Sequence, residues 1–462
     1  MTEARSARGP TAGWPASSWR FDRSIILSDL ALLATASSVV GLFAISPETL
    51  EAQGIAYMTS GGGALSKVHP STLLALIALV LRCLAGRRPL RTAWTLATGD
   101  AGVVLMLGAC AIASFYAVKV SHTPMTPLID TFVLPVLMVL LLRGINPAIL
   151  RGLALVVGLV FCANAVIAIL EVLRHWHLVS IPVPAGATSD PRRGDATFDW
   201  RAQLAEDWRA TALFGHPLSN GLATGALIIC SVARGTDWIA PAVKVPVVLL
   251  QAAAMFAFGA RSALVLTGVA TVLLIVKRSL AALSAGQRLS PRRLAIVLCL
   301  LFVAIGLGTA LVDSGFANQT LERFQDDQGS ATTRVTMFNL FAPLSWSSIM
   351  LGPDPEQVAT LQRLDGLEFG IESSWIGLAL TYGAIVTAIL LTGMGAFTWS
   401  VLKASGPGGG AVILYFYILA SVAATMSTKT TIFAMTIVLI LIFLQRDDSR
   451  RASRPAASAG WA

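Results

Sequence analysis

Two apolar runs, 245–258 and 263–276, follow each other with almost nothing between them. Each run is just long enough to cross, or nearly cross, a hydrocarbon core of ~30 Å. Because no room is left for a loop, Arg261 must lie at or just below a membrane surface, where an unpaired charge costs several kcal/mol. The small residues around it, in the segment 259–262, let a ligand or another backbone approach closely. We expect Arg261 either to extend to the lipid headgroups or to hold a phosphate or pyrophosphate, for which guanidinium is a natural partner.

The composition of the whole chain agrees with this membrane setting. Of its 462 residues, 55% are hydrophobic and only 13% are charged, whereas a soluble domain carries about 25% charged residues. The net charge of +9 does not indicate a nucleic-acid partner, because the basic residues lie in short connections between the apolar runs. The first run, 25–45, lacks a suitably placed small-residue cleavage site, so we expect a retained helix and not a signal peptide.

Twelve apolar runs predict an all-α, polytopic membrane protein with about 12 transmembrane helices. The predicted spans are 25–45, 71–86, 93–117, 128–143, 151–172, 216–233, 244–259, 262–276, 294–312, 373–396, 411–426 and 430–445. Basic clusters precede the first span, follow the last, and lie after the second, fourth and eighth, all on one side, which is therefore the cytoplasm. We expect cytoplasmic tails at 1–24 and 447–462, and a transmembrane domain at 25–446.

The larger connections fall on the opposite, outer side of this topology. Periplasmic loops are predicted at 173–215 and 313–371. The second is the longest, lies before the tenth helix, and is expected to be partly helical at 320–324 and 332–340. All five histidines and most of the acidic residues also fall on the outer side. We therefore expect a multi-pass protein of the bacterial inner (cytoplasmic) membrane, with its active site facing the periplasm.

Three arginines from separate outer segments form the predicted binding site. Arg209 precedes the sixth span, Arg261 lies between the seventh and eighth, and Arg334 lies in the last long loop. A fixed array of such donors would stabilise the negative charge that develops on a departing phosphate. The alternative for Arg209 and Arg334 is that they are solvated loop charges, or that they pair with Asp207 and Asp326.

His216 and Glu372 are the candidate catalytic residues. His216 precedes Pro217 at the start of the sixth span, where it either caps the helix or hydrogen-bonds a substrate hydroxyl or phosphate. Glu372 opens the tenth span, and is either a plain helix-start carboxylate or a general base toward a sugar hydroxyl. A metal site at His175, His177 and His216 is not expected, because nothing fixes its third ligand, and no cofactor is expected.

The order and spacing of these features resemble the O-antigen ligase and O-antigen polymerase superfamily. The matching pieces are Phe214-Gly-His216-Pro217, Gly259-Ala-Arg261-Ser262, Arg334 followed by Leu344 to Gly352-Pro-Asp, and Glu372-Ser-Ser-Trp375 leading to Tyr382-Gly383. The span count and the large late periplasmic loop agree as well. The resemblance covers roughly the second half of the chain well, and the first half only by hydropathy.

The resemblance implies a metal-independent, inverting glycosyltransferase with an all-helical membrane fold. Members of this family take a glycan from undecaprenyl pyrophosphate at the periplasmic face. Ligases pass it to a lipid A core, and polymerases pass it to another lipid-linked repeat unit. By the match, Arg209, Arg261 and Arg334 hold the pyrophosphate. Ligases carry a His-Asn pair where span 10 begins, whereas this chain has Glu372-Ser373, so we expect a polymerase of exopolysaccharide, capsule or O-antigen.

Two alternatives stay open beside the polymerase. The first is an O-antigen ligase that transfers glycan to the lipid A core. The second, a polysaccharide or lipid transporter, is less favoured because the spans are largely apolar and show no internal repeat. The expected partners are an undecaprenyl-pyrophosphate-linked glycan donor, a glycan acceptor and the lipid bilayer. A chain-length regulator and a flippase are candidate protein partners, and no nucleic acid is expected.

Overall fold

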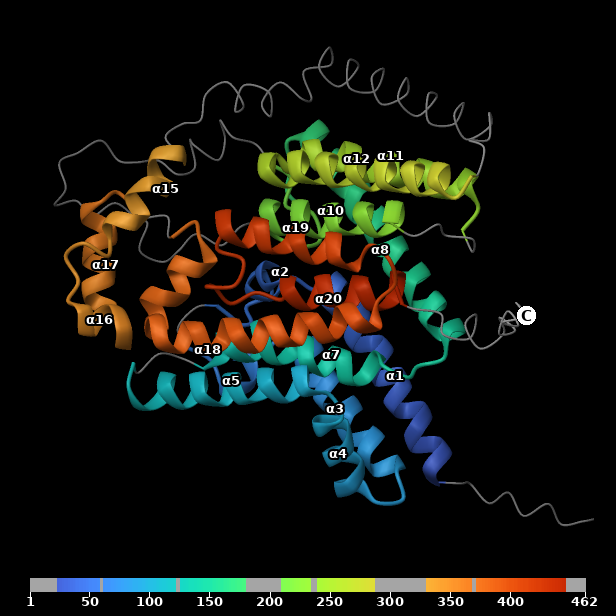
Figure 1. Ribbon diagram of the computed structural model, residues 1–462, viewed down its shortest axis with the longest axis horizontal. Helices are drawn as coiled ribbons and strands as arrows, with labels where there is room; N and C mark the ends of the chain where they lie inside the picture. The colour runs from blue at the N-terminus through green and yellow to red at the C-terminus, as the bar shows by residue number, and fades with distance from the viewer. Residues whose placement is uncertain are drawn as a thin grey trace, which may run out of the picture.

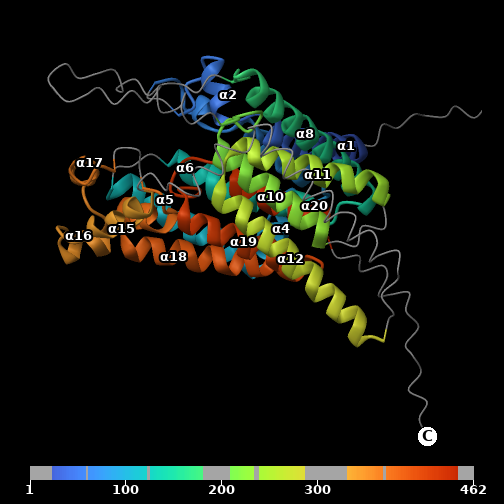
Figure 2. The same ribbon diagram turned by 90° about the horizontal axis from the view of Figure 1, so that it is seen from above.

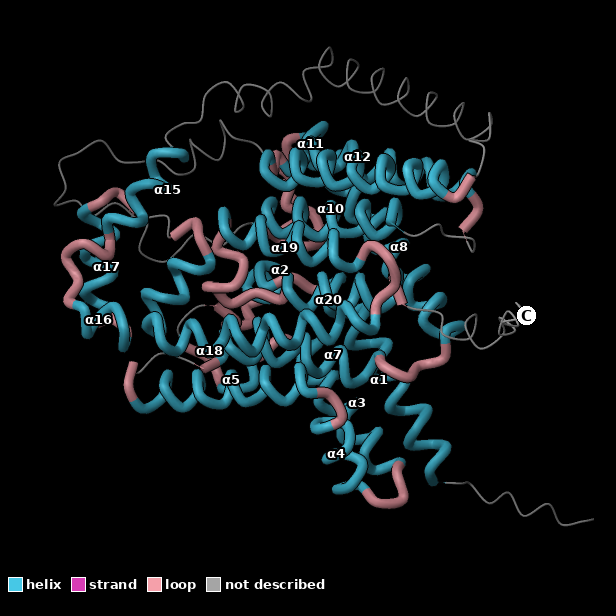
Figure 3. The backbone as a smooth tube through the Cα atoms, in the orientation of Figure 1, coloured by secondary structure: helices cyan, strands magenta, loops and turns pink. Residues whose placement is uncertain are grey.

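The computed structural model describes residues 23–58, 61–121, 125–179, 209–233, 239–286, 330–367 and 371–445. Within these ranges the chain is helical and contains no β-strand (Figure 3). The one β-bridge there pairs single residues, Ser405 and Gln445, next to the end of the described chain. This part of the structure therefore confirms an all-α fold.

In the part of the chain that the structure describes, six helices are long and apolar enough to cross a membrane, as expected for a multi-pass membrane protein. They are α1 (Arg23–Ala44), α5 (Ala101–Lys119), α8 (Pro147–Arg174), α11 (Pro241–Phe258), α12 (Arg261–Ser284) and α18 (Ser374–Ala404). Shorter apolar helices are α3 (Pro70–Ala85), the continuous unit of α6 (Thr126–Leu128), η2 (Ile129–Val133) and α7 (Leu134–Leu142), then α10 (Pro217–Ala233), α19 (Gly409–Val422) and α20 (Ile432–Phe443). The predicted span 294–312 lies outside the described residues, and every other predicted span overlaps one of these helices.

The shortest apolar helices form the centre of the bundle. Every residue of α7 and of α20 is buried, which fits their hydrophobicity on all sides. Phe433 of α20 stacks on Phe416 of α19 with ring centroids 5.1 Å apart. Figures 1 and 2 show α20 enclosed by its neighbours and α5 and α18 side by side at one edge, while α10 packs against both α11 and α12.

The expectation of one helix over 93–117 is wrong. The chain forms α4 (Pro89–Thr98) and then α5, with a break at Gly99 and Asp100. The Asp100 carboxylate accepts hydrogen bonds from the backbone N–H groups of Gly102 and Val103, so it caps α5. It also bonds Arg143 and Ser400. Burial alone would raise the pKa of Asp100, but the bonds from Ser400 and Arg143 hold it below its usual value.

Helix α18 differs from the predicted span 373–396 because it is longer and is broken near its start. Gly383 has φ 77° and ψ 161°, which is not a helical conformation. The end of α16 (Trp346–Leu351) crosses at this point, and a Cβ atom at Gly383 would overlap the backbone N of Gly352. Only glycine satisfies both the positive φ and this close approach.

The last long outer segment is partly helical where it is described. The predicted helix at 332–340 is confirmed as α15 (Ser330–Asn339), whereas the one at 320–324 lies outside the described residues. Helices α16 and α17 (Pro355–Leu364) follow, and the three are grouped beyond one end of α18 (Figure 1). Met337 and Leu340 pack with Ile376 and Leu380 of α18, so a small apolar core attaches this group to the bundle.

Candidate functional site

Helices α10 and α12 begin next to each other. Only Gly259 and Ala260 separate α11 from α12, as expected from the absence of room for a loop. A Cβ atom at Gly221 would lie 2.5 Å from the Cβ of Ala260, so the first turn of α10 packs directly on this connection. Ala260 is buried, and its small side chain lets the backbone of α10 come close. Because each helix start carries partial positive charge and free N–H groups, this corner of the protein favours an anion.

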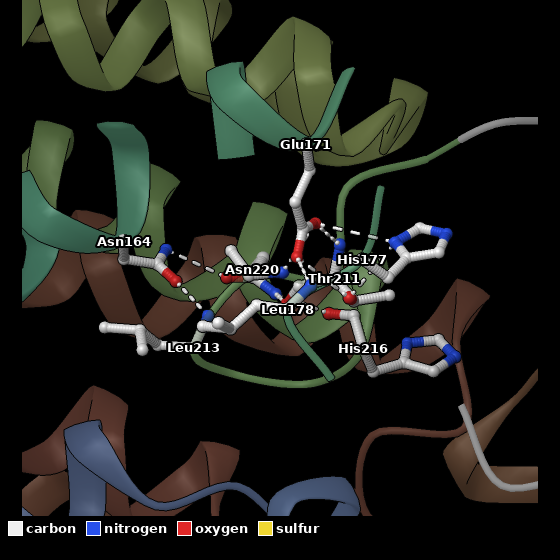
Figure 4. A network of polar contacts seen from close by, with 9 residues as sticks. Asn164, Glu171, His177, Leu178, Thr211, Leu213, His216 and Asn220 are labelled. Carbon is white, nitrogen blue, oxygen red and sulfur yellow. Dashed lines mark hydrogen bonds and ion pairs between the residues drawn. The ribbon is translucent and has the colours of Figure 1, made fainter. Parts of the chain in front are cut away.

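The segment 209–216, called the site loop below, is held in place by the buried amides of Asn164 and Asn220 (Figure 4). The backbone N–H of Leu213 donates to Asn164 Oδ1 at 2.8 Å. Asn164 Nδ2 donates to Asn220 Oδ1 at 2.9 Å, and Asn220 Nδ2 donates back to the Thr211 carbonyl at 2.6 Å. The loop is therefore tied to both α8 and α10 by a closed hydrogen-bond network.

Glu171, near the end of α8, adds a buried carboxylate to this network. Its Oε2 accepts from the N–H groups of Thr211 at 2.7 Å and Ala212 at 3.0 Å, and its Oε1 accepts from Leu178 at 2.7 Å. His177 Nδ1 lies 3.6 Å from Oε2. Ala212 has φ 41°, a left-handed conformation that costs about 1 kcal/mol for alanine. Charge-assisted bonds to the carboxylate hold the loop in this strained shape.

The site loop brings Arg209 within electrostatic reach of Arg261 and Glu372. The N–H of Ala210 donates to the carbonyl of Ala257 at 3.0 Å, which places the start of the loop at the end of α11. Loss of hydration lowers the pKa of Arg209, the charge of Arg261 lowers it further, and the charge of Glu372 raises it. Two of the predicted site residues, from separate segments, therefore act electrostatically on a third, Arg209.

His216 lies at the end of the site loop and caps α10. Its Nδ1 accepts the N–H of Leu218 at 3.2 Å, so the ring proton of the neutral imidazole belongs on Nε2. Although part of the residue faces solvent, the surrounding protein removes much of its hydration, and this together with the charge of Arg209 lowers the pKa of His216 to about 4. His216 is therefore neutral at pH 7. The capping role uses one ring nitrogen and leaves the other as a donor.

The third predicted arginine, Arg334, lies on α15. Its side chain is outside the described residues, but α15 belongs to the helical group packed on the start of α18, beside Glu372 in the sequence. Helix α15 thus lies at the same end of the bundle as the start of α18 (Figure 1). Its role in binding stays a prediction.

Glu48, on α2 (Pro47–Ala52), contacts the site loop but was not singled out in the sequence. A Cβ atom at Gly215, where φ is 73°, would overlap Glu48 Oε2. This oxygen is buried and makes no hydrogen bond within the described structure. Loss of hydration raises the pKa of Glu48, against the opposing effect of a hydrogen bond with Ser46. Carboxyl groups with perturbed pKa values cluster at functional sites. An acidic residue in the first turn of any helix is favoured by the helix dipole, so the sequence alone does not mark Glu48 as functional.

A second buried carboxylate, Asp130 of η2, organises another cluster of polar residues, the Asp130 cluster. Tyr57 Oη and Thr72 Oγ1 each donate to it at 2.7 Å, and the N–H of His69 lies 3.2 Å from both of its oxygens. The ammonium of Lys429 lies 3.3 Å from the centroid of the Tyr57 ring and donates to the Tyr57 carbonyl at 2.7 Å. The cluster joins segments that are far apart in the sequence.

Glu48 connects the two clusters electrostatically. Loss of hydration raises the pKa of Tyr57, and the charges of Asp130 and Glu48 raise it further. Because Glu48 also contacts Gly215, polar groups extend from the Asp130 cluster to the site loop and on to Arg209. Among the described residues, no group of three or more histidine, cysteine or acidic side chains is arranged to hold a metal ion.

The chain matches no protein-family model and no curated protein. The function is therefore argued from the residues of the site and their geometry.

Proposed function

We propose that the protein is a membrane glycosyltransferase that uses an undecaprenyl-pyrophosphate-linked oligosaccharide as donor. It polymerises such repeat units in the synthesis of exopolysaccharide, capsule or O-antigen. The observation that carries this proposal is the electrostatic interaction of Arg209, beside the end of α11, with Arg261 at the start of α12, next to the start of α10. Two guanidinium groups and two helix starts at one place favour a ligand with more than one negative charge, as a pyrophosphate has.

The cationic groups would act on the leaving group of the transfer. As the bond between the anomeric carbon and the phosphate oxygen breaks, negative charge develops on the departing pyrophosphate. Arg209 and Arg261 stabilise this charge without reorganisation, because Glu171, Asn164 and Asn220 already fix the loop that carries Arg209. The neutral His216 adds an Nε2–H donor toward a phosphate oxygen or a sugar hydroxyl.

Glu372 is the proposed base in this reaction. It is exposed and its charge acts on Arg209, which supports a carboxylate within reach of the donor sugar. In an inverting transfer the acceptor hydroxyl attacks the anomeric carbon from the face opposite the pyrophosphate, and its proton passes to the carboxylate. The new glycosidic bond forms as the bond to the pyrophosphate breaks, so no covalent sugar–enzyme intermediate is needed.

The proposed setting is the bacterial inner membrane, with the site on the periplasmic side. A donor held by its lipid would reach this site from the bilayer, after a flippase has brought it across. A chain-length regulator is the second protein partner that a polymerase of this kind would require. The acceptor is another lipid-linked glycan.

The decisive experiment replaces Arg261 by Ala and by Lys in the producing cell. We expect single repeat units to accumulate on lipid or on the lipid A core, with a milder defect in R261K because lysine keeps the charge but loses bidentate geometry. The matched control is Arg363→Ala, which removes an exposed arginine from α17. Full-length polymer stranded on undecaprenyl pyrophosphate would indicate a ligase instead. Unchanged glycan in both Arg261 variants would refute the site.

A further inference from the structure

Helix α4 presents two large apolar side chains to its surroundings at the end of the bundle where α3 stops and α5 begins. Leu90 is 88% exposed and Trp94 is 69% exposed. They lie one helical turn apart, so they share one face of the helix. The opposite face carries Leu96, which packs against the main hydrophobic core. Figure 1 shows α4 away from the centre of the bundle, beyond the end of α3.

Three exposed arginines border this apolar face. Arg87 and Arg88 precede the helix, and Arg91 lies on its first turn. Arg91 follows Leu90 directly on the helix, and Arg87 and Arg88 lie just before its first residue, so basic side chains border the apolar row. This side of the protein is the one predicted to be cytoplasmic from the distribution of basic residues.

The orientation of α4 is fixed by the connections at both of its ends. A Cβ atom at Gly86 would lie 2.5 Å from Thr92 Oγ1, so the chain turns tightly from α3 into α4. Thr92 Oγ1 also donates to the carbonyl of Arg88 at 3.1 Å. At the other end, Asp100 caps α5 and pairs with Arg143. The helix therefore holds its apolar row and Arg91 in a constant relation to the neighbouring helices.

We propose that α4 lies in the headgroup layer of the cytoplasmic leaflet and binds anionic phospholipid. Leu90 and Trp94 enter the boundary of the acyl chains, where tryptophan is favoured. Arg87, Arg88 and Arg91 contact headgroup phosphates, to which guanidinium groups are complementary in charge and geometry. Phospholipid fits better than a protein partner, because the apolar row continues from helices that already face hydrocarbon. Val80 and Leu84 of α3 are exposed next to it.

The test compares two double variants of the full-length protein that remove equal charge from the same side. Arg87→Gln with Arg91→Gln alters α4, and Arg151→Gln with Lys277→Gln alters exposed residues of α8 and α12. Native mass spectrometry in detergent counts bound dioleoyl-phosphatidylglycerol against bound dioleoyl-phosphatidylcholine. We expect the α4 double variant to lower the preference for phosphatidylglycerol by about 10- to 30-fold, since each arginine near an anionic surface contributes about 1 kcal/mol, and tenfold corresponds to 1.36 kcal/mol.

A second measurement checks where Trp94 lies. In vesicles of phosphatidylcholine and phosphatidylglycerol at a 3:1 ratio, with bromine atoms near the start of the acyl chains, Trp94→Phe should remove part of the tryptophan quenching seen in the parent protein. Equal loss of lipid preference in the two double variants would overturn the proposal, because general charge would then explain it. Quenching unchanged by Trp94→Phe would also overturn it, since α4 would then face water or a protein partner.

Discussion

Glu171 and Asp130 are both buried carboxylates on the outer side of the predicted topology, yet they accept hydrogen bonds from different kinds of groups. Glu171 accepts mainly backbone N–H groups, two of them from consecutive residues of the site loop. Asp130 accepts the side-chain hydroxyls of Tyr57 and Thr72, which belong to other segments. The first carboxylate therefore sets the shape of a loop, whereas the second cross-links the bundle. Loss of Glu171 should affect the site more than the fold, and loss of Asp130 the reverse.

Replacing Asp130 by Ala should have the largest effect on stability. The change leaves the hydroxyls of Tyr57 and Thr72 and the N–H of His69 without their acceptor in a buried place. We expect a loss of about 3–5 kcal/mol in the free energy of unfolding, at about 1–3 kcal/mol per buried unsatisfied group and allowing for partial relaxation. Thermal unfolding of the purified protein measures it. Asp130→Asn keeps one acceptor and should lose less; equal losses would show that the carboxylate is not the organising group.

Glu171→Gln should reduce activity more than stability. The amide keeps one acceptor oxygen, so the side chain loses either its bonds to Thr211 and Ala212 or its bond to Leu178. The bonds that remain are no longer charge-assisted, so the loop is held less firmly and Arg209 shifts with it. A misplacement of about 1 Å can reduce a rate by about 100-fold, so we expect a 10- to 100-fold loss in glycan polymerisation. Glu356→Gln, on the exposed surface of α17, is the control and should leave the rate unchanged. An unfolding temperature lowered as far as in the Asp130 variants would contradict the distinction between the two carboxylates.

The contact between Glu48 and the site loop can be tested at Gly215. Gly215→Ala places a Cβ atom against Glu48 Oε2 at a left-handed position, and we expect a cost of about 1–3 kcal/mol. Combining it with Glu48→Ala should reduce this cost by about 1 kcal/mol, as a double-mutant cycle would show. Gly158→Ala, in open space on α8, is the control and should not destabilise. Additive effects of the two changes would mean that Glu48 does not touch the loop.

The smallest expected effect on stability concerns His216 of the site loop and Lys429 of the Asp130 cluster. The two residues should change the stability over different pH ranges. Loss of hydration lowers both pKa values, to about 4 from 6.5 for His216 and to about 8 from 10.5 for Lys429. The unfolded chain binds more protons than the folded one between each pair of values, so stability rises with pH in both windows. Plots of unfolding temperature against pH should flatten between pH 4 and 6.5 in His216→Gln, and between pH 8 and 10.5 in Lys429→Met. The assignments would be wrong if His216→Gln flattened the plot between pH 8 and 10.5, or if Lys429→Met flattened it between pH 4 and 6.5.

The helices could be predicted from the sequence because long apolar runs have one stable form in hydrocarbon. The abrupt connection from α11 to α12 also followed, since nothing but Gly259 and Ala260 remains between the runs. The break at Asp100 did not, because hydropathy does not distinguish an acidic residue within a helix from one that caps it. The residues around Asp100 are compatible both with one continuous helix and with a break that Asp100 caps.

The site was partly predictable for a related reason. The predicted topology has Arg209, Arg261 and Glu372 on one side, and the structure adds that the charges of Arg261 and Glu372 act on Arg209. The groups that hold the site could not be found in this way. Glu171 lies within a long apolar helix, and Glu48 reaches Gly215 across a large separation in the sequence. Contacts of this kind leave no periodic pattern in either segment.

The crossing at Gly352 and Gly383 has a consequence for recognising relatives of this chain. A Cβ atom at Gly383 would overlap the backbone of Gly352, one at Gly352 would crowd the backbone N of Gly383 at 3.2 Å, and both residues have positive φ. A larger residue at one position cannot be compensated by a smaller one at the other, because glycine is already the smallest. A chain that shares this crossing should therefore carry glycine at both positions, and the pair can be searched for as a two-site signature even where overall identity is too low to detect.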